Sequence, residues 1–200
     1  GELMPAAFLA MAEESGLIDR LTRSVILKAL TQTSRWLDEG YALQVAINVS
    51  PQQFRNTDLL ANVTQALIDT RLPPAMLELE ITESVLVQDA PETTRVFKAL
   101  NELGITLSLD DFGTGYSSLS YLKRFPMQVL KIDKSFVRNI VNNADDATIV
   151  DTIVQMGRNL NMDVVAEGVE EEAQLNFLQK MGCTIVAVSD VSGGLYCAGG

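Results

Sequence analysis

The sequence contains no histidine. This absence excludes Ser-His-Asp and Cys-His nucleophilic sites, zinc sites with histidine ligands, and acid–base catalysis by imidazole. Any catalysis must therefore use carboxylates, lysine, tyrosine, backbone groups or a metal ion held by oxygen ligands. The two cysteines, Cys183 and Cys197, are too few for a disulfide framework, so we expect a reducing, cytoplasmic setting. The sequence shows no basic, apolar leader and no apolar run of membrane-spanning length, so we expect neither a signal peptide nor a transmembrane helix.

Positive charge is also scarce, because 15 Lys and Arg residues stand against 26 Asp and Glu residues and the net charge is −11. A long nucleic-acid backbone attracts Lys and Arg, so we expect no long nucleic acid as a partner. A small nucleotide ligand stays compatible with this charge, since a bound divalent metal can reverse the local potential. Hydrophobic residues make up 47% of the chain, which is enough to bury a sizeable core.

Predicted helices and strands alternate along the chain, without an internal repeat or a linker, which indicates a single domain. The strands are nearly continuous apolar runs, as is typical of buried parallel strands. Their order fits both a doubly wound sheet and a (β/α) barrel. We expect strands at residues 43–49, 76–82, 105–109, 127–132, 164–166 and 183–188, and helices at residues 5–17, 19–38, 57–69, 91–103, 117–124, 145–160 and 171–181.

Polar or charged residues stand at the C-terminal end of five successive predicted strands. In an open sheet such residues concentrate at one crevice, whereas in a barrel they all converge at the mouth. Five successive strand ends of this kind therefore favour the barrel. The residues concerned are Asn48, then Glu80 and Glu83, then Asp110 and Asp111, then Lys131 and Asp133, and finally Glu167 and Glu170.

These side chains indicate a metal site. Glu80, Asp110 and Asp111, with the carbonyl of Asn48, form the oxygen-rich set that Mg²⁺ or Mn²⁺ prefers. Adjacent aspartates can serve two ions, and two ions about 3.5–4 Å apart stabilise the attacking and leaving oxygens of a phosphoryl displacement. Lys131 can orient a water molecule or neutralise a phosphate oxygen.

Glu167 can complete such a metal site or polarise the water, and the flexible loop at residues 113–115 lets backbone amides approach a ligand. Taken singly, these residues also have structural interpretations: the two aspartates could cap a turn, and Lys131 and Glu167 could form a structural ion pair. From the pattern alone, a Mg²⁺-dependent enolase-type enzyme with Lys131 as its base is a further interpretation. The shared position at successive strand ends favours a functional site.

Several motifs, taken together and in order, resemble the EAL domain, the cyclic-di-GMP phosphodiesterase module of bacterial signalling. The resemblance extends from Gly1 to about Val186, and its most specific part is Asp-Asp-Phe-Gly-Thr-Gly at residues 110–115, which disfavours the enolase interpretation. The other matching stretches are residues 12–18, 48–54, 77–84, 116–119, 131–133 and 166–170.

The resemblance implies a modified (β/α)₈ barrel that hydrolyses cyclic di-GMP to linear pGpG with two Mg²⁺ or Mn²⁺ ions. It implies a homodimer, and fusion to GGDEF or sensory domains through which a full-length parent could be anchored to a membrane. Two alternatives stay open, a non-catalytic cyclic-di-GMP receptor and a dimerisation module. The resemblance also assigns roles by position. The residues that match metal ligands are Asn48, Glu80, Asp110, Asp111 and Glu167. Lys131 matches the lysine that holds the hydrolytic water, and Glu170 follows Glu167 near the substrate. Glu83 matches the glutamate that supports the loop containing Gly113, Thr114 and Gly115.

Both ends depart from the family pattern. The first strand, with the Glu-Ala-Leu motif that includes a metal ligand, is expected upstream of Gly1, and Ala187 replaces a glutamine expected to line the site. We therefore expect a partial barrel domain at residues 1–186 and an aberrant tail at residues 187–200. A frameshift is one hypothesis for the tail, because codons for residues 188–192 read one base later can encode Tyr-Leu-Met-Phe. We expect this chain by itself to be poorly stable and slow or inactive.

Overall fold

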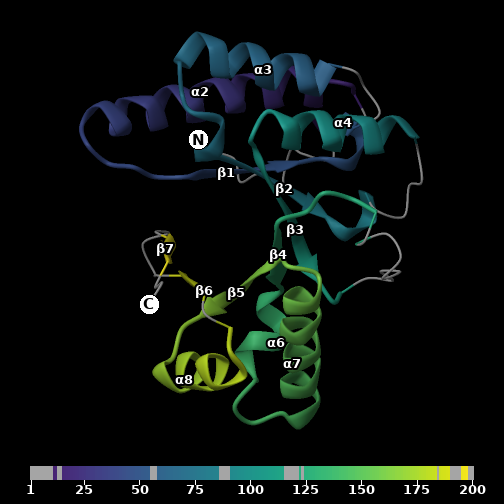
Figure 1. Cartoon of the computed structure of the whole chain (residues 1–200), viewed down its shortest axis with the longest axis vertical. Helices are drawn as coiled ribbons and strands as arrows, with labels where there is room; N and C mark the ends of the chain where they lie inside the picture. Colours follow the sequence, from purple (N-terminus) through teal and green to yellow (C-terminus); the bar gives the residue numbers. More distant parts are fainter. Residues whose placement is uncertain are drawn as a thin grey trace. The chain divides into compact units, whose positions relative to one another are not determined.

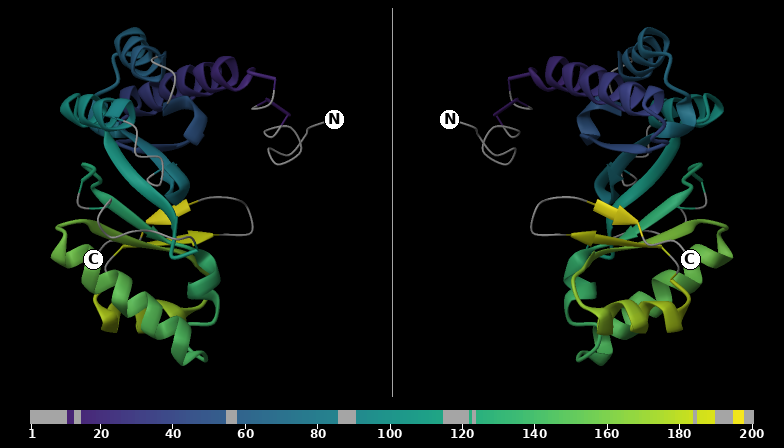
Figure 2. Two further views of the ribbon diagram at one scale, coloured as in Figure 1. Left: turned by 90° about the vertical axis from the view of Figure 1, so that its right-hand side faces the viewer. Right: turned by 90° about the vertical axis from the view of Figure 1, so that its left-hand side faces the viewer.

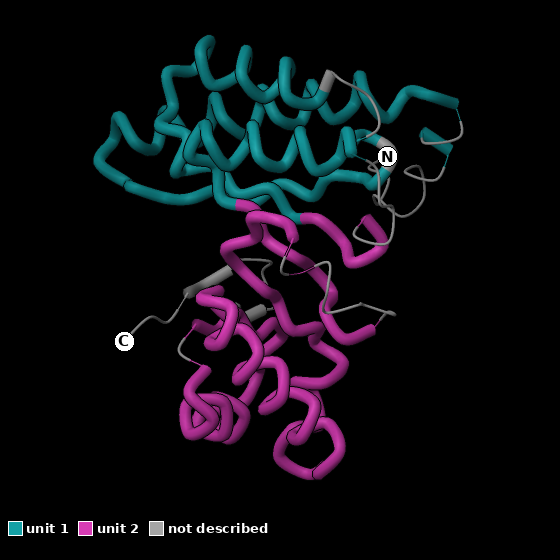
Figure 3. The backbone as a smooth tube through the Cα atoms, turned by 45° about the vertical axis from the view of Figure 1, so that its right-hand side comes forward, with its two compact units in different colours: residues 1–80, 88–106 teal, residues 81–87, 107–200 magenta. Residues whose placement is uncertain are grey.

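The computed structural model describes residues 11–12, 15–54, 58–85, 91–114, 122, 124–183, 185–189 and 195–197. The helices predicted at residues 5–17 and 117–124 fall largely outside this set, as does Gly115. The chain divides into two compact units, which Figure 3 colours separately. Unit 1 comprises residues 1–80 and 88–106, and unit 2 comprises residues 81–87 and 107–200.

The strands follow one another in chain order, β1-β2-β3-β4-β5-β6-β7, with neighbouring strands hydrogen-bonded. The pairs β3–β4, β4–β5 and β5–β6 are parallel, as the apolar runs predict. The pair β6–β7 is antiparallel. The strand bounds are β1 Val45–Val49, β2 Leu77–Thr82, β3 Thr106–Phe112, β4 Val129–Ile132, β5 Asp163–Val169, β6 Ile185–Ser189 and β7 Leu195–Cys197 (Figure 1).

Unit 1 holds the helices α2 (Ile18–Asp38), α3 (Asp58–Thr70) and α4 (Pro91–Glu102). The helix α2 contacts α3 and β1, and α3 contacts α4. Helical periodicity explains this packing, because the buried residues of α2 recur every three or four positions and form one face. They are Ile18, Thr22, Ile26, Leu30 and Thr33. Short 3₁₀ helices follow β1, at Pro51–Phe54, and precede β2, at Pro74–Met76.

Unit 2 holds the helices α6 (Lys134–Arg138), α7 (Ala144–Asn159) and α8 (Glu172–Met181), which lie on the same side of its strands (Figure 1). The sequence analysis did not predict α6, which begins directly after β4. The helix α7 starts at Asn143, whose side chain accepts hydrogen bonds from the backbone of the first turn. The helix α8 ends at Gly182, where a φ of 82° favours glycine. A 3₁₀ helix at Glu83–Val85 also belongs to this unit.

Two of the strands in unit 2 contain bulges at their acidic residues. Between β3 and β4, Leu109 pairs with Leu130 and Phe112 pairs with Ile132, so two aspartates stand opposite the single residue between those partners. Between β5 and β6, Glu167 pairs with Ala187 and Val169 pairs with Val188, so Gly168 is the additional residue. Bulges change the direction of side chains and often lie beside functional sites.

The predicted strands at residues 105–109 and 164–166 were therefore too short, since β3 and β5 continue through their charged residues to Phe112 and Val169. A charged residue looks like the end of a buried strand, but a bulge allows the strand to continue past it.

The tail predicted as aberrant contributes backbone to the sheet. The strand β7, at Leu195–Cys197, pairs with β6 in a register that joins Ala187 to Cys197 (Figure 2). Among the helices of the described residues, none is long and apolar enough to cross a membrane.

Candidate functional site

In unit 1, the structure brings together Asn48 at the end of β1 and Glu80 in β2. The side-chain amide of Asn48 donates a hydrogen bond of 2.8 Å to Oε2 of Glu80. Glu80 is buried, with 7% of its surface exposed, whereas Asn48 is exposed. The bond uses the amide nitrogen of Asn48 and not its side-chain oxygen. The two predicted ligands of unit 1 therefore form one polar pair.

In unit 2, Lys131 in β4 and Glu167 in β5 form an ion pair. Nζ of Lys131 lies 2.7 Å from Oε1 of Glu167, and the side chains are 13% and 26% exposed. The two strands are parallel neighbours, and the bulge at Gly168 begins directly after Glu167. A pair this enclosed interacts more strongly than a surface salt bridge.

The paired aspartates lie in the bulge of β3. Asp111 has a left-handed φ of 53°, a conformation that aspartate tolerates better than most residues. Partial burial and the adjacent charge of Asp110 raise the pKa of Asp111 to about 6, with the nearby carboxylates of Asp133 and Glu167 contributing further. An oxygen of Asp110, Oδ1, is buried without a hydrogen-bond partner. The bulge therefore concentrates negative charge at one point of unit 2.

Asp133 is a member of this cluster to which the sequence analysis assigned no role. It is the N-cap of α6, and its carboxylate accepts hydrogen bonds from the backbone N–H of Ser135 at 2.9 Å and from the Ser135 hydroxyl. Partial burial opposes its ionisation, but the bonds from Ser135 and from Asp111 outweigh burial and lower its pKa. The sequence signal was its position two residues after Lys131, at the end of the same strand.

The remaining predicted residues are Glu83, Gly113, Thr114, Gly115 and Glu170. Glu83 is buried, with 6% of its surface exposed, in the 3₁₀ helix after β2. Gly113 and Thr114 follow β3, where the Thr114 hydroxyl donates to the carbonyl of Asp111 at 2.8 Å. Glu170 is exposed beyond β5, and its N–H donates to Gln174 at 2.8 Å. The prediction for Gly115 falls outside the described residues.

The donor chemistry of the aspartate pair fits a hard divalent cation. A cation would satisfy the unpartnered Oδ1 of Asp110 and relieve the repulsion that raises the pKa of Asp111. Within the described part of the chain, no group of three or more acidic or cysteine side chains is already arranged to hold one ion. A cation would therefore have to bring further ligand atoms closer to the aspartates as it binds.

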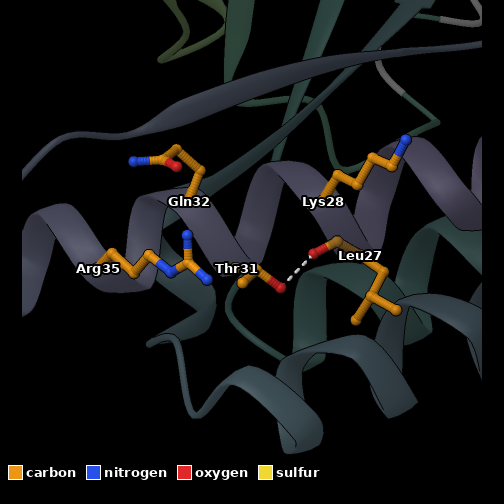
Figure 4. Close-up of a pocket in the computed structure, with 5 residues that line it drawn as sticks. All are labelled: Leu27, Lys28, Thr31, Gln32 and Arg35. Atoms are coloured by element: carbon orange, nitrogen blue, oxygen red, sulfur yellow. Dashed lines mark hydrogen bonds between the residues drawn. The ribbon is translucent and has the colours of Figure 1, made fainter.

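The hollows described on the surface lie elsewhere, in unit 1. One, of about 430 Å³, is lined by residues of α2 alone, from Leu27 to Arg35 (Figure 4). Another, of about 380 Å³, lies between the C-terminal ends of α3 and α4, with Ile68 and Leu103 on its wall. Neither is lined by a residue that the sequence analysis assigned to the site, so these hollows do not identify it.

Comparison with known proteins identifies the family of this chain. The family profile described as the EAL domain matches residues 1–187. The chain is 45% identical over 184 residues to the bifunctional diguanylate cyclase/cyclic di-GMP phosphodiesterase MucR of Pseudomonas aeruginosa, covering 92% of this chain and 27% of that protein. It is 40% identical over 182 residues to the cyclic di-GMP phosphodiesterase PdeR of Escherichia coli, covering 91% of this chain and 28% of that protein. The chain thus spans about a quarter of the length of these curated relatives.

Solved structures show the same relationship at the level of the fold. The MucR phosphodiesterase in complex with cyclic di-GMP matches with a TM-score of 0.85 at 45% identity, covering 90% of this chain and 74% of that chain. The EAL domain of FimX from Pseudomonas aeruginosa, bound to cyclic di-GMP, matches with a TM-score of 0.84 at 25% identity, covering 93% of this chain and 74% of that chain. The predicted α/β fold of the barrel type is confirmed.

The profile match over nearly the whole chain, the relatives above 40% identity in sequence or structure, and the strand-end carboxylates all lead to one assignment. This chain belongs to the EAL domain family.

Proposed function

We propose that this chain is a metal-dependent phosphodiesterase domain that hydrolyses cyclic di-GMP to linear pGpG. The observation that carries the proposal is the cluster in unit 2, where Asp110, Asp111 and Asp133 stand close to the ion pair of Lys131 and Glu167. Perturbed carboxylates gathered around an enclosed lysine are typical of functional sites. The names of the relatives support the substrate class.

The proposed ligands are Asp110, Asp111 and Glu167 in unit 2, and Asn48 with Glu80 in unit 1. Mg²⁺ or Mn²⁺ ions, when bound, would supply positive charge to the phosphate oxygens and lower the pKa of the attacking water. The residues of the chain would position these ions, and the unpartnered oxygen of Asp110 is already buried in unit 2 for that purpose. Carboxylate and amide oxygens are the donors that such hard cations select.

Lys131 has the second proposed role. Its ammonium is held 2.7 Å from Glu167, so it cannot swing away to solvent, and its charge is available for a phosphate oxygen or for the attacking water. Glu167 keeps the lysine in place, and its carboxylate is the kind of acceptor that a cation or a water molecule uses. Glu83, buried near the start of unit 2, is proposed to support the loop after Asp111, which contains Gly113 and Thr114.

The proposal extends to the limits of the domain and to its partners. We propose a domain at residues 1–186 followed by a tail at residues 187–200, and the end of the family profile at residue 187 supports that boundary. The relatives are much longer than this chain, which supports fusion to further domains such as GGDEF. A homodimer and a cytoplasmic location complete the proposal.

A non-catalytic receptor for cyclic di-GMP is the second candidate. The observation on its side is that, within the described residues, no three acidic groups are already arranged to hold one ion. The FimX EAL domain, a structural neighbour, is known in a form bound to cyclic di-GMP. A receptor and an enzyme would both bind cyclic di-GMP, but only the enzyme would hydrolyse it.

The test is incubation of the chain with cyclic di-GMP and Mg²⁺ or Mn²⁺, followed by chromatographic separation of the products. Linear pGpG that appears with the unaltered chain and is lost with Asp110→Ala would support the enzyme. Binding of cyclic di-GMP without product, also when the segments that the family pattern places before residue 1 and after residue 186 are supplied, would support the receptor, whereas product that appears only with those segments would support an enzyme that is impaired in this chain. A chain that neither binds nor cleaves the nucleotide would contradict both candidates.

A further inference from the structure

Gln174, in the first turn of α8, caps its own helix and also makes a hydrogen bond to another helix, α6. Its Oε1 accepts from the backbone N–H of Glu171, the N-cap, at 3.0 Å, which is the bonding of a capping box, and also from the backbone N–H of Glu170 at 2.8 Å. Its Nε2 donates to the carbonyl oxygen of Arg138 at 3.2 Å. Gln174 is 5% exposed, so its side-chain amide is largely removed from water.

The additional bond joins two segments that both come from the candidate site. Arg138 is the last residue of α6, and α6 follows Lys131 after only Asp133 and one strand residue. Glu170 lies three residues after Glu167. Gln174 thus connects the segment that leaves β4 to the segment that leaves β5.

The same two segments touch at two further points. At the strand ends, Lys131 and Glu167 form their ion pair of 2.7 Å. Between the ends, Gly168 faces Lys134 so closely that a Cβ on Gly168 would lie 2.6 Å from the Cβ of Lys134. The segments are therefore held together at the beginning, in the middle and, through Gln174, at the end.

We propose that Gln174 is a positioning residue for the site, and that its bond to Arg138 fixes the separation of Lys131 and Glu167. The bulge at Gly168 shifts the register between β5 and β6 directly after Glu167, so the regular pairing of β5 with β6 ends at that residue. A catalytic pair must be held within about 0.5 Å of its working geometry, and a buried amide that bonds both segments supplies that restraint. This inference rests on the proposed phosphodiesterase function only for its kinetic consequence.

The test compares Gln174→Glu with Gln174→Met. Glutamate retains the acceptor that caps α8 but has no donor for the Arg138 carbonyl, whereas methionine removes both interactions at nearly constant volume. We expect Gln174→Glu to lower the melting temperature, because the Arg138 carbonyl loses its donor, and to lower kcat by roughly tenfold to a hundredfold, with KM within about twofold. A protonated carboxyl can donate to Arg138, so the ratio of variant to unaltered kcat should rise as the pH falls towards about 4.5.

A second readout is independent of turnover. In amide NMR spectra without nucleotide, Gln174→Glu should shift the signals of Lys131, Asp133 and Glu167 as well as those beside α8. A kcat equal to that of the unaltered chain, or shifts confined to residues 170–178, would overturn the proposal and leave Gln174 as a helix cap. If the unaltered chain forms no product, the proposed function fails, and the amide spectra then decide the role of Gln174 by themselves.

Discussion

Lys131 and Glu167, which stand 36 positions apart in the sequence, meet in an ion pair of 2.7 Å between neighbouring parallel strands. Neither side chain is more than 26% exposed, so neither charge can be fully solvated if its partner is removed.

Removing the charge of Glu167 should therefore affect stability and turnover together. We expect Glu167→Gln to lower the free energy of unfolding by about 1–2 kcal/mol, less than for a fully buried pair, and to lower kcat by about 10²-fold. Urea unfolding and product chromatography measure the two effects. The double variant Lys131→Met/Glu167→Gln should lose less stability than the sum of its single variants, and simple additivity would show that the pair is not coupled.

Neutralising Asp110 should have opposite effects on stability and on metal binding. Its buried Oδ1 has no hydrogen-bond partner and its charge repels Asp111, so Asp110→Asn should raise the free energy of unfolding by about 0.5–1 kcal/mol in the absence of divalent ions. The same variant should lose the stabilisation that Mg²⁺ gives to the unaltered chain. Melting curves with and without Mg²⁺ test both statements, and a variant that is still stabilised by Mg²⁺ would remove Asp110 from the ligand set.

The raised pKa of Asp111 should make stability depend on pH. The folded state holds this proton up to about pH 6, whereas an unfolded aspartate releases it near the ordinary pKa of 3.8. Between these values the folded state binds more protons, so this group favours folding below about pH 4, and its contribution falls as the pH rises to about 6. Unfolding curves without divalent ions should show this trend in the difference between the unaltered chain and Asp111→Asn. A difference that does not change over this range would contradict it.

Proton release from Asp111 should also govern metal affinity. A protonated carboxyl is a poor ligand, so Mg²⁺ should bind more tightly as the pH rises from about 5 to 7. Calorimetric titration at several pH values measures the change, and the dependence should weaken in Asp111→Asn. An affinity that stays constant across this range would separate Asp111 from the metal.

Gly168 should resist substitution more than a glycine with the same backbone restriction and free space. Gly168→Ala combines a φ of 70° with a Cβ placed 2.6 Å from that of Lys134. Gly40 has a φ of 94° and nothing within 4 Å of an added Cβ, so Gly40→Ala isolates the backbone cost of about 1–2 kcal/mol. We expect Gly168→Ala to cost a further 1–3 kcal/mol or so and to lower kcat, because relief of the clash moves the segment after Glu167. Equal costs in denaturant unfolding would show that the contact with Lys134 is not restrictive.

The order of the elements could be predicted from the sequence because it depends on local patterns. Apolar residues every three or four positions predicted α2, and apolar runs predicted the parallel strands. The candidate ligands could be predicted for a related reason, since a charge at the end of a buried strand has few structural explanations. Asp110 and Asp111 stood out on that ground, and the motif that begins with them pointed to the EAL domain family, which the comparisons confirm.

Features that depend on pairing between distant segments could not be predicted in this way. A bulge is a mismatch of register between two strands, so neither the one at Asp110 and Asp111 nor the one at Gly168 is visible in one strand alone. The helix α6 is too short, at five residues, to show helical periodicity, and its N-cap Asp133 was left without a role for that reason.

The sequence by itself determined the class of fold, the family and the acidic residues, because apolar periodicity and residue type are local properties of the chain. The tertiary structure decided that Lys131 faces Glu167, that Asp133 joins Asp111, and that Gln174 reaches Arg138. Those contacts join residues separated by 22 to 36 positions, and only the pairing of strands and the packing of helices brings such residues within bonding distance.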